Sequence, residues 1–318
     1  MTMNKSTALA IVRTMVKIRK FEQSVSTLFR KAELAGFVHM SLGQESVAAA
    51  ACAALQPQDY ITSTHRGHGQ CIAKGAELKP MMAELFAKAT GMCGGKGGSM
   101  HIADVRLGIL GANGIVGAGL GIGLGGAFGR DLLGSSGVSV SFIGDGACNV
   151  GLFHEAMNIA AIWKLPYILI VENNQWTEMS PSKDLMSVQT VAERAAAYGI
   201  PGVRITDDVE SIFDAVTQAR RRALEGEGPS IIECVTHRWH GHYEGDSQKY
   251  RTKEEVLATR SADALRRFVE RCQQLGYLSA DEFKAIELET DAEVAAAIEF
   301  SRNSPDPTLE EALQTAYV

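Results

Sequence analysis

Hydrophobic residues recur along this chain with two different periods, and each period predicts a type of element. Near the start, apolar residues at three-to-four spacing predict a long helix that Ser6 caps and that ends by Gly36. A second helix is expected over 47–55, because Pro57 cannot continue it, and a third helix over 78–89. Between them, DYITSTHRGHGQ predicts a short strand that runs into a polar loop.

The middle of the chain alternates between β-branched runs and helical patterns. VSVSFIG (138–144) and PYILIV (166–171) predict two buried strands, and the segment 149–165 between them predicts a helix. That unit is long enough for a parallel crossover, and strands that are apolar on both faces are typical of parallel sheets. GVRIT (202–206) and SIIECVTH (230–237) predict further strands, with a helix between them. The sequence therefore predicts an α/β fold with a doubly wound parallel sheet.

Helical extensions are expected at both ends of this sheet. The segment after Tyr250 has a mostly helical and acidic pattern, and Pro305 and Pro307 interrupt its tail. No internal repeat or low-complexity linker divides the chain. We therefore expect one domain over 1–318, with a core at about 40–240 and a C-terminal extension at about 252–318.

Composition excludes several classes of partner. The net charge of −6 and the pI of about 5.8 argue against a nucleic-acid binder, which needs a basic face. No apolar run is long enough to span a membrane, and the start MTMNKSTALA lacks the apolar core of a signal peptide. The six cysteines form no C-x-x-C pair, so they are expected to be free thiols. These features favour a cytoplasmic protein that acts on a small molecule.

The segment 144–174, GDGACNVGLFHEAMNIAAIWKLPYILIVENN, carries the main chemical signal. Asp145 ends one predicted strand and Asn174 ends the next, so both should reach the same edge of the sheet. A carboxylate and an amide oxygen suit Mg²⁺, which usually completes its shell with phosphates and water. Gly144 and Gly146 allow close approach of a bulky anion, and the amides that open the next helix can donate to it. The pattern predicts a Mg²⁺–diphosphate clamp.

A competing motif lies just upstream. Gly121, Gly123 and Gly126 match G-x-G-x-x-G, and Asp145 follows at about the distance of the acidic residue in dinucleotide-binding folds. An NAD-linked Rossmann oxidoreductase is therefore an alternative. That fingerprint must directly follow a strand, and RLGILGANGIVGAGL is a poor strand pattern because glycines interrupt it. A helix of small residues that packs closely against its neighbours explains GAGLGIGLGGAFG better.

Longer stretches of the chain resemble a known family. They include SLGQESVA, YITSTHRGHG, LFAKATGMCGGKGGSMH, GANGIVGAGL, FIGDGACNVGLFHEAMNIAAIWKLP, ENNQW and HRWHGHYEGD, and cover about residues 10–257. The chain is similar to the α subunits of thiamine-diphosphate-dependent acetoin and 2-oxo acid dehydrogenase complexes. In that family GDG, followed at a distance by NN, is the cofactor signature. The resemblance implies the thiamine diphosphate-binding fold, with thiamine diphosphate and Mg²⁺ as cofactors.

The resemblance also assigns a role to each matching position. It implies that Mg²⁺ is held by Asp145, Asn174 and the backbone carbonyl of Trp176. The implied cofactor-binding residues are His65, Arg66, Gly114, Val116, Asp145, Gly146, Ala147 and Asn174. Position 65 is often Tyr in the family. His242 resembles the catalytic His that faces the reacting carbon. His237, His240 and His242 have spacings that could suggest zinc, but no fourth ligand accompanies them.

Partners and substrate follow from the same resemblance. The Glu that activates the cofactor comes from a separate β subunit in this family, so activity is expected only in an α₂β₂ heterotetramer that feeds a lipoyl-bearing acyltransferase core. The GHYEGD loop resembles acetoin dehydrogenases, which cleave acetoin to acetaldehyde and pass the remaining two-carbon group to the lipoyl carrier. Pyruvate or branched-chain 2-oxo acid dehydrogenase is the alternative. A non-catalytic scaffold is a third class, disfavoured because Arg66, Asp145, Asn174 and His242 are all present.

Overall fold

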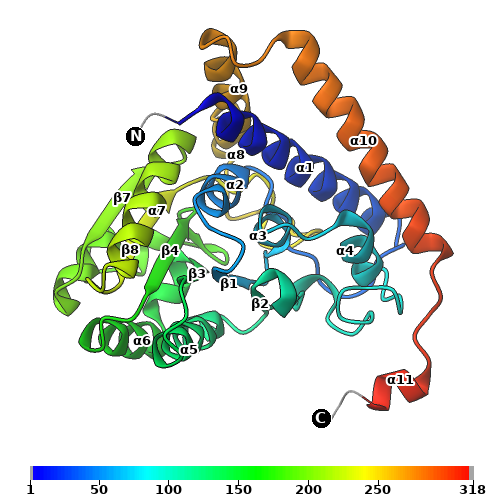
Figure 1. Ribbon diagram of the computed structural model, residues 1–318. Helices are drawn as coiled ribbons and strands as arrows, with labels where there is room; N and C mark the ends of the chain where they lie inside the picture. The colour runs from blue at the N-terminus through cyan, green and yellow to red at the C-terminus, as the bar shows by residue number, and fades with distance from the viewer. Residues whose placement is uncertain (1–2, 315–318) are drawn as a thin grey trace.

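A six-stranded parallel sheet forms the centre of the computed structural model, which describes residues 3–314 (Figure 1). Its strand order is β2-β1-β3-β4-β8-β7, and every neighbouring pair is parallel. The strands are β1 (Tyr60–Thr64), β2 (Ile109–Asn113), β3 (Ser139–Gly144), β4 (Tyr167–Asn173), β7 (Gly202–Thr206) and β8 (Ser230–Val235). A short antiparallel pair, β5 (Trp176–Thr177) and β6 (Ser180–Pro181), follows β4.

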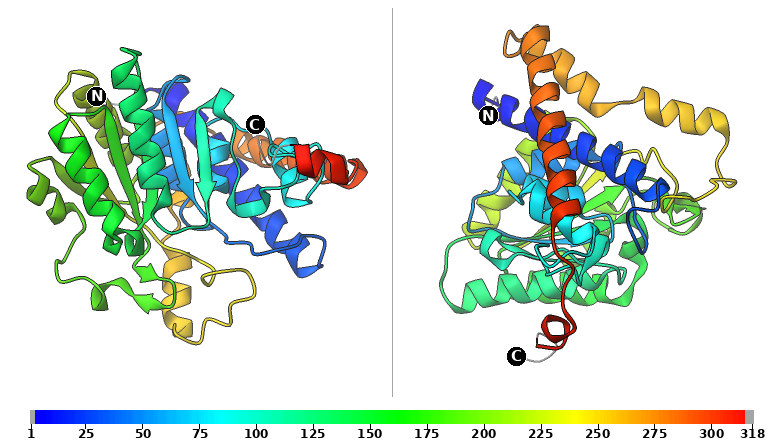
Figure 2. Two further views of the ribbon diagram at one scale, coloured as in Figure 1. Left: turned by 90° about the horizontal axis from the view of Figure 1, so that it is seen from below. Right: turned by 90° about the vertical axis from the view of Figure 1, so that its right-hand side faces the viewer.

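Helices cover both faces of the sheet, as Figures 1 and 2 show. One face carries α5 (Ala118–Leu132) and α6 (Gly151–Ile162), drawn below the sheet in Figure 1. The other carries α1 (Lys5–Arg30), α2 (Glu45–Ala53), α3 (His68–Ala73), α4 (Leu78–Leu85), α7 (Val209–Leu224), α9 (Ala264–Gln274) and α10 (Ala280–Asn303). Along β4, Ile168 and Ile170 join the core on this second face, whereas Leu169 and Val171 join the core under α5 and α6. The predicted doubly wound parallel sheet is confirmed.

The chain after β8 forms an arm of helices. It contains α8 (Lys253–Ser261), α9 and α10, and ends in α11 (Leu309–Gln314). α10 packs along α1 and α4, and three ion pairs join it to α1: Arg13–Glu289, Lys17–Glu293 and Lys20–Asp291. Prolines at 305 and 307 separate α10 from α11, which lies away from the main body in Figure 1. Residues 315–318 of the predicted extension lie outside the described residues.

Several predicted boundaries differ from the structure. Asn4, not Ser6, caps α1, because its side-chain oxygen accepts the Thr7 amide hydrogen at 2.9 Å. α1 ends at Arg30, well before Gly36, and α2 begins at Glu45 rather than at residue 47. Side-chain caps and tertiary packing decide these ends, and neither is visible in hydrophobic periodicity.

The glycine-rich segment holds a strand that the pattern did not predict. β2 lies within RLGILGANGIVGAGL, whose glycines interrupt the strand pattern, and Gly111 is tolerated there with φ of 145°. The fingerprint glycines nevertheless lie inside α5 rather than at the turn that opens it. A Cβ on Gly123 would lie 2.2 Å from Ser141 Oγ, so the glycine allows α5 to pack tightly on the sheet. The dinucleotide motif therefore lacks its structural context, and the predicted small-residue helix is confirmed.

Short 3₁₀ helices complete the fold: η1 (Gly98–Met100), η2 (Val105–Leu107), η3 (Asp145–Asn149), η4 (Ser182–Asp184) and η5 (Ala192–Tyr198). Among residues 3–314, no helix is both long and apolar enough to cross a membrane.

Candidate active site

A pocket opens at the carboxyl ends of the strands, at the point in the sheet where the order of the strands reverses. β1 is flanked by β2 on one side and by β3 on the other, and such a reversal leaves a crevice outside the strand ends. The space in and around the pocket, including its open mouth, is about 910 Å³. Among the predicted site residues, those that line it are His65, Arg66, Val116, Asp145, Gly146, Ala147, Asn174, Trp176 and His242.

Gly114 is the predicted residue that does not line the pocket. Its neighbours Asn113 and Ile115 do, whereas the Gly114 amide lies 3.4 Å from His101 Nε2. A Cβ on Gly114 would come within 3.3 Å of the same nitrogen. The structure therefore places Gly114 against the His101 side chain, while its two neighbours in the same loop contribute to the pocket wall.

Asp145 lies at the end of β3 and is almost completely buried. The carboxylate opens η3, with only 2% of the residue exposed, and Ser182 Oγ donates a hydrogen bond to its Oδ2. Burial raises the pKa of Asp145 above its ordinary value, against the opposing effect of the Ser182 hydrogen bond. A buried carboxylate of this kind is costly unless a cation compensates it. Asp145 is therefore well suited to hold a metal ion in the pocket.

The two asparagines after β4 have different tasks. Asn173 donates to Glu233 Oε1 at 2.7 Å and accepts the Gln175 amide hydrogen, so it anchors the turn. Asn174 faces the pocket, where its Nδ2 donates to Gln44 Oε1 at 3.0 Å and its Oδ1 accepts from the Trp176 amide. The Gln44 contact orients the Asn174 amide, and its Oδ1 retains a second lone pair for a ligand.

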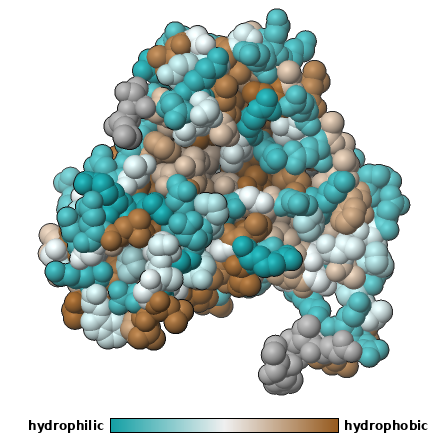
Figure 3. All heavy atoms as spheres, viewed as in Figure 1, coloured by the Kyte–Doolittle hydropathy of each residue, from teal (hydrophilic) through white to brown (hydrophobic). Residues whose placement is uncertain are grey.

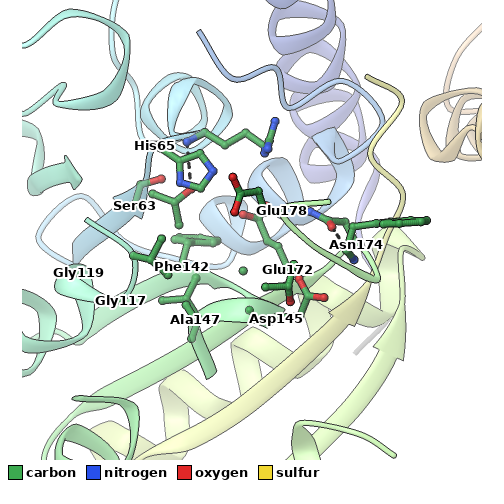
Figure 4. A pocket seen from close by; sticks show the side chains of 18 of the residues that line it. Ser63, His65, Gly117, Gly119, Phe142, Asp145, Ala147, Glu172, Asn174 and Glu178 are labelled. Carbon is green, nitrogen blue, oxygen red and sulfur yellow. Dashed lines mark hydrogen bonds between the residues drawn. The ribbon is translucent and has the colours of Figure 1, made fainter. Parts of the chain in front are cut away.

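Glu172 is a pocket residue that sequence reasoning missed. It is 3% exposed, Gln70 Nε2 donates to its Oε2 at 2.9 Å, and its Oε1 has no hydrogen-bond partner among the described residues. Burial raises the pKa of Glu172 to about 8. Figure 4 shows Glu172, Asp145 and Asn174 around one part of the pocket. The sequence does carry a signal for Glu172, because it is an acidic residue at the end of a predicted buried strand, directly before the NN pair.

Glycines let the backbone approach the pocket at two points. A Cβ on Gly146 would lie 2.6 Å from the Thr177 side chain, so no larger residue fits between η3 and the β5 segment. Gly117 has φ of 83° at the N-cap of α5, a left-handed conformation that favours glycine. The N-terminus of α5 thereby meets the pocket wall at Gly117 and Gly119.

Two arginines border the pocket with their donors directed to the main chain. Arg66 is buried, and its guanidinium donates to the Met40 carbonyl at 2.5 Å and to the His242 carbonyl at 3.0 Å. Arg238, only 1% exposed, donates to the His240 and Glu178 carbonyls. Burial, together with Arg238, lowers the pKa of Arg66 to about 9. The pair makes this side of the pocket electropositive, as an anionic cofactor requires.

Three imidazoles from distant parts of the chain meet beside Arg66. The ring centre of His39 lies 4.6 Å from that of His65 and 5.1 Å from that of His242, and His65 and His242 are 5.5 Å apart. Burial and the charge of Arg66 lower their pKa values to about 3 for His39, about 2 for His65 and about 4 for His242. All three rings are therefore neutral at physiological pH. His39 was not assigned a role from the sequence, because only the fold brings it to the pocket.

A side-chain network holds the loop that carries His242. Asp246 accepts the His242 amide hydrogen at 2.7 Å, the Gln248 amide hydrogen at 2.9 Å and the Tyr250 hydroxyl at 2.5 Å. His240 Nδ1 is 3.0 Å from Glu244 Oε2, which explains why it does not join a metal site. Among residues 3–314, the sole group of three potential metal ligands is His39, His65 and His242, so the 237/240/242 zinc arrangement is absent.

The mouth of the pocket adjoins an exposed apolar surface. Ile115 and Val116 are 72% and 54% exposed although both line the pocket. Exposed apolar side chains continue along α5 and α6, and Figure 3 shows apolar residues gathered along this lower edge. The members of this α5–α6 surface are Ile122, Phe128, Leu132, Leu133, Ile162 and Trp163. Phe128 and Trp163 are in contact, with ring centres 5.4 Å apart. Exposed apolar side chains that gather on neighbouring helices are typical of a protein–protein interface.

The residues present fit a metal–diphosphate group. Buried Asp145 supplies a carboxylate, Asn174 supplies an amide oxygen, and Gly146 leaves room for close approach. The unpartnered Oε1 of Glu172 adds an acceptor for a metal-bound water, and the arginines contribute positive charge. Hard oxygen donors beside positive charge are the chemistry that Mg²⁺ and a diphosphate need together.

Comparison with known proteins agrees with this chemistry. Residues 13–310 match the family described as "Dehydrogenase E1 component". The chain is 45% identical to the α subunit of acetoin:2,6-dichlorophenolindophenol oxidoreductase from Bacillus subtilis, over 100% of this chain and 96% of the relative. It is 41% identical to the α subunit of the same name from Cupriavidus necator, over 99% and 96%. It is also 37% identical to the pyruvate dehydrogenase E1 component α subunit of Rhizobium meliloti, over 97% and 89%.

These relatives are all named as α subunits, which implies a β-subunit partner for this chain. The matched region includes every strand of the sheet and every residue that lines the pocket. The chain therefore belongs to the dehydrogenase E1 component family of thiamine-diphosphate-dependent enzymes, as an α-subunit member.

Proposed function

We propose that this chain, together with a β subunit, binds Mg²⁺ and thiamine diphosphate in the pocket at the strand ends and acts on acetoin. The observation that carries the proposal is the convergence of buried Asp145 and Asn174 in one pocket, at the ends of neighbouring strands. When bound, the cofactor supplies a carbon nucleophile and an electron sink for C–C cleavage.

In this proposal the chain's own residues divide the work of holding the cofactor. Asp145, Asn174 and the backbone of Trp176 hold Mg²⁺, and the amides at Gly146 and Ala147 face the diphosphate. Arg66 supplies positive charge beside it, although its guanidinium also supports the backbone at Met40 and His242. The apolar side chain of Val116 supports the organic part of the cofactor at the pocket mouth, and the Gly114 backbone, in the same loop, packs against the His101 side chain.

His242 is proposed to move protons at the reacting centre. Its ring lines the pocket, and its Nδ1 is buried without a hydrogen-bond partner among the described residues. A neutral imidazole can accept a proton and return it. The Asp246 network fixes the backbone that presents this ring.

A β subunit is proposed to cover the mouth of the pocket in an α₂β₂ heterotetramer. Support comes from the exposed side chains of Ile115 and Val116 at the pocket and from the exposed apolar side chains of the α5–α6 surface defined above. A partner that buries these side chains would also complete the pocket. The product is proposed to pass to a lipoyl-bearing acyltransferase core.

Acetoin is preferred as the substrate because two α-subunit relatives are named for acetoin and show 45% and 41% identity. Pyruvate is the second candidate, because a relative at 37% identity is named for it. We also propose a cytoplasmic location, supported by six cysteines that are all free thiols.

The proposal is tested with the chain co-expressed with its β subunit. The complex receives Mg²⁺ and thiamine diphosphate, and reduction of an artificial dye is followed with acetoin, pyruvate and branched-chain 2-oxo acids. A rate with acetoin at least about tenfold above the others supports the assignment. A preference for pyruvate would change the assigned substrate from acetoin to pyruvate. Rates that do not depend on thiamine diphosphate would contradict the assignment of the pocket as its binding site.

A further inference from the structure

A buried carboxylate organises the loop after α4, which we call the α4 loop (91–98). Glu84 lies in the last turn of α4, and it is completely buried. Both of its oxygens accept hydrogen bonds from main-chain amides of the α4 loop, at distances of 2.7–3.0 Å. The donors are Cys93 and Gly95 to Oε2, and Gly97 and Gly98 to Oε1. A buried carboxylate is costly unless it is paired or hydrogen-bonded, and these amides provide the compensation.

The glycines of GMCGGKGG let the α4 loop wrap around this carboxylate. A Cβ on Gly91 would overlap Glu84 Oε2, and one on Gly95 would lie 2.5 Å from the main chain of Ala87. Gly95 also has φ of 75°, in the left-handed region that favours glycine. The carboxylate therefore holds in one conformation a loop whose composition would allow many. The proposed function gives this arrangement no role.

A second buried contact fixes the chain just after the α4 loop. Ser99 Oγ lies 2.9 Å from His68 Nε2, and His68 Nδ1 lies 3.3 Å from Glu22 Oε1. All three residues are buried, and His68 opens α3, two residues after Arg66. The loop is thus tied to α4 in its middle and to α3 at its end.

His101 connects the α4 loop to the pocket wall. Its Nδ1 lies 3.2 Å from the Gly97 carbonyl oxygen, and its Nε2 lies 3.4 Å from the Gly114 amide nitrogen. A neutral imidazole with its proton on Nδ1 makes both contacts, because it donates to the carbonyl and accepts from the amide. The Gly97 residue joins the two halves of this path, since its own amide donates to Glu84.

The segment that His101 contacts carries two pocket residues. Ile115 and Val116 line the pocket, and the Ile115 amide donates to Asn113 Oδ1 at 2.8 Å. Both side chains are largely exposed, so packing against the core does not fix them. Their positions therefore depend on the backbone contacts of the segment 113–117, among which is the contact between Gly114 and His101.

We propose that Glu84 is a positioning residue for the cofactor. Its carboxylate fixes the α4 loop, and His101 transmits that fixed position to the segment 113–117, which places Val116 at the pocket. This inference rests on the proposed function, in which Val116 supports the organic part of thiamine diphosphate. Glu84 acts only through these contacts, because it does not itself line the pocket.

The diphosphate end of the pocket is held by a different structure. Asp145 and Asn174 follow β3 and β4, and the pairing of these two strands does not involve the α4 loop. Loosening of the segment 113–117 should therefore weaken binding of the organic part of the cofactor and leave binding of the diphosphate unchanged. Inorganic diphosphate with Mg²⁺ probes the diphosphate end alone. A residue that only stabilised the fold would not separate the two ligands.

The test uses the complete complex with its β subunit and three variants: Glu84→Gln, His101→Phe and the double variant. Gln keeps the size of the Glu84 side chain but turns one acceptor oxygen into a donor that faces main-chain N–H groups. His101 is exposed, so His101→Phe carries the test if Glu84→Gln fails to fold. Isothermal titration gives Kd for thiamine diphosphate and for inorganic diphosphate in Mg²⁺, and hydrogen exchange follows the peptide over 113–117.

Two further substitutions serve as matched controls. Glu77→Gln changes an exposed carboxylate at the N-cap of the same helix, where the side chain makes no capping hydrogen bond. His154→Phe removes an exposed imidazole on α6 that contacts the Tyr198 hydroxyl outside the pocket. Both controls should leave the two dissociation constants and the hydrogen exchange over 113–117 unchanged.

For Glu84→Gln we expect the Kd of thiamine diphosphate to rise about tenfold and kcat to fall about 10–100-fold, because the reacting group is misplaced. The Kd of inorganic diphosphate should stay within about threefold, and hydrogen exchange over 113–117 should become at least about tenfold faster. His101→Phe should change the same quantities in the same direction. The double variant should lie within about twofold of Glu84→Gln alone, because both changes break one path.

Three results would overturn the proposal, and each has a distinct meaning. Unchanged Kd values and exchange in Glu84→Gln would mean that the contact between Ser99 and His68 alone fixes the loop. Equal losses of affinity for both ligands would show a general loss of stability. Faster exchange in Glu84→Gln, without any change in His101→Phe, would show that the path does not run through His101. Failure of the proposed function itself would appear differently, as a wild-type complex that binds neither thiamine diphosphate nor inorganic diphosphate.

Discussion

The two sides of the pocket are built in different ways. On one side, Asp145 and Asn174 directly follow strands β3 and β4, which pair in parallel along six residue positions from Ser139↔Tyr167 to Gly144↔Glu172. On the other side, His242 lies in a loop after β8, and side chains rather than a ladder hold it. The sheet fixes the first side, and a small polar network fixes the second.

This contrast explains which residues could be predicted from the sequence. Two buried strands joined by a crossover helix necessarily end at one edge, so Asp145 and Asn174 could be placed together without any tertiary information. His39, Gln44 and Ser182 could not be predicted, because contacts between remote segments bring them to the pocket. Glu172 lies on β4 itself, so its place beside Asn174 was open to prediction from the same strand end. The role of His242 was predicted from the resemblance of its loop to the family, and not from hydrophobic periodicity.

The secondary structure also divides into elements that the local sequence pattern predicts and elements that depend on tertiary contacts. Alternating apolar runs predicted five of the six strands of the main sheet, whereas β2 was missed. Glycine at position 111 weakens the local strand signal, and pairing with β1 overrides it from Thr62↔Gly111 onward. Cap positions such as Asn4 depend on one side-chain hydrogen bond, which apolar spacing does not record.

The largest expected effect comes from breaking the sheet-fixed side. Asp145→Ala removes a buried carboxylate that is 2% exposed, and we expect Mg²⁺-dependent thiamine diphosphate affinity to fall at least about 100-fold. Isothermal titration of the complex measures it. Asp184→Ala is the control, because Asp184 is exposed in nearby η4 and should leave the affinity unchanged. Equal affinity in Asp145→Ala would refute its assignment as a metal ligand.

A smaller effect, of a different kind, is expected on the loop side. Asp246→Ala removes the acceptor of three hydrogen bonds that hold the loop around His242. We expect kcat to fall about 10–100-fold as the ring loses its orientation, while cofactor Kd changes less than about threefold. Steady-state kinetics and cofactor titration separate the two. If Asp246→Ala weakened cofactor affinity as much as it lowers kcat, the two sides of the pocket would not differ in role.

A single supporting hydrogen bond sharpens the comparison further. Ser182 donates to Asp145 from η4, so Ser182→Ala should weaken Mg²⁺ affinity about 3–30-fold by loosening the carboxylate. Competition between Mg²⁺ and EDTA at fixed thiamine diphosphate gives the value. Thr190→Ala, which removes an exposed hydroxyl paired with Glu193, provides the comparison. An unchanged Mg²⁺ affinity would mean that the sheet alone orients Asp145.

The smallest expected effect is a pH dependence of stability from the imidazole side. The folded-state pKa values of His39 and His242 are about 3 and about 4, below the ordinary 6.5. Below pH 6.5 the unfolded chain binds protons that the folded protein does not, so stability is full above that pH and falls toward pH 4. Urea denaturation at pH 7.5 and at pH 5.5 should show this loss. His39→Gln should reduce the difference, and an unchanged difference would contradict the depressed pKa of His39.

The central claim is that the strand ends form a Mg²⁺–diphosphate clamp, and one titration tests it most directly. The complex with its β subunit is titrated with thiamine diphosphate in Mg²⁺ and in EDTA, with NAD as a parallel ligand. The account predicts saturable thiamine diphosphate binding that requires Mg²⁺, and no binding of NAD. Binding of NAD alone, or thiamine diphosphate binding that EDTA does not weaken, would contradict it.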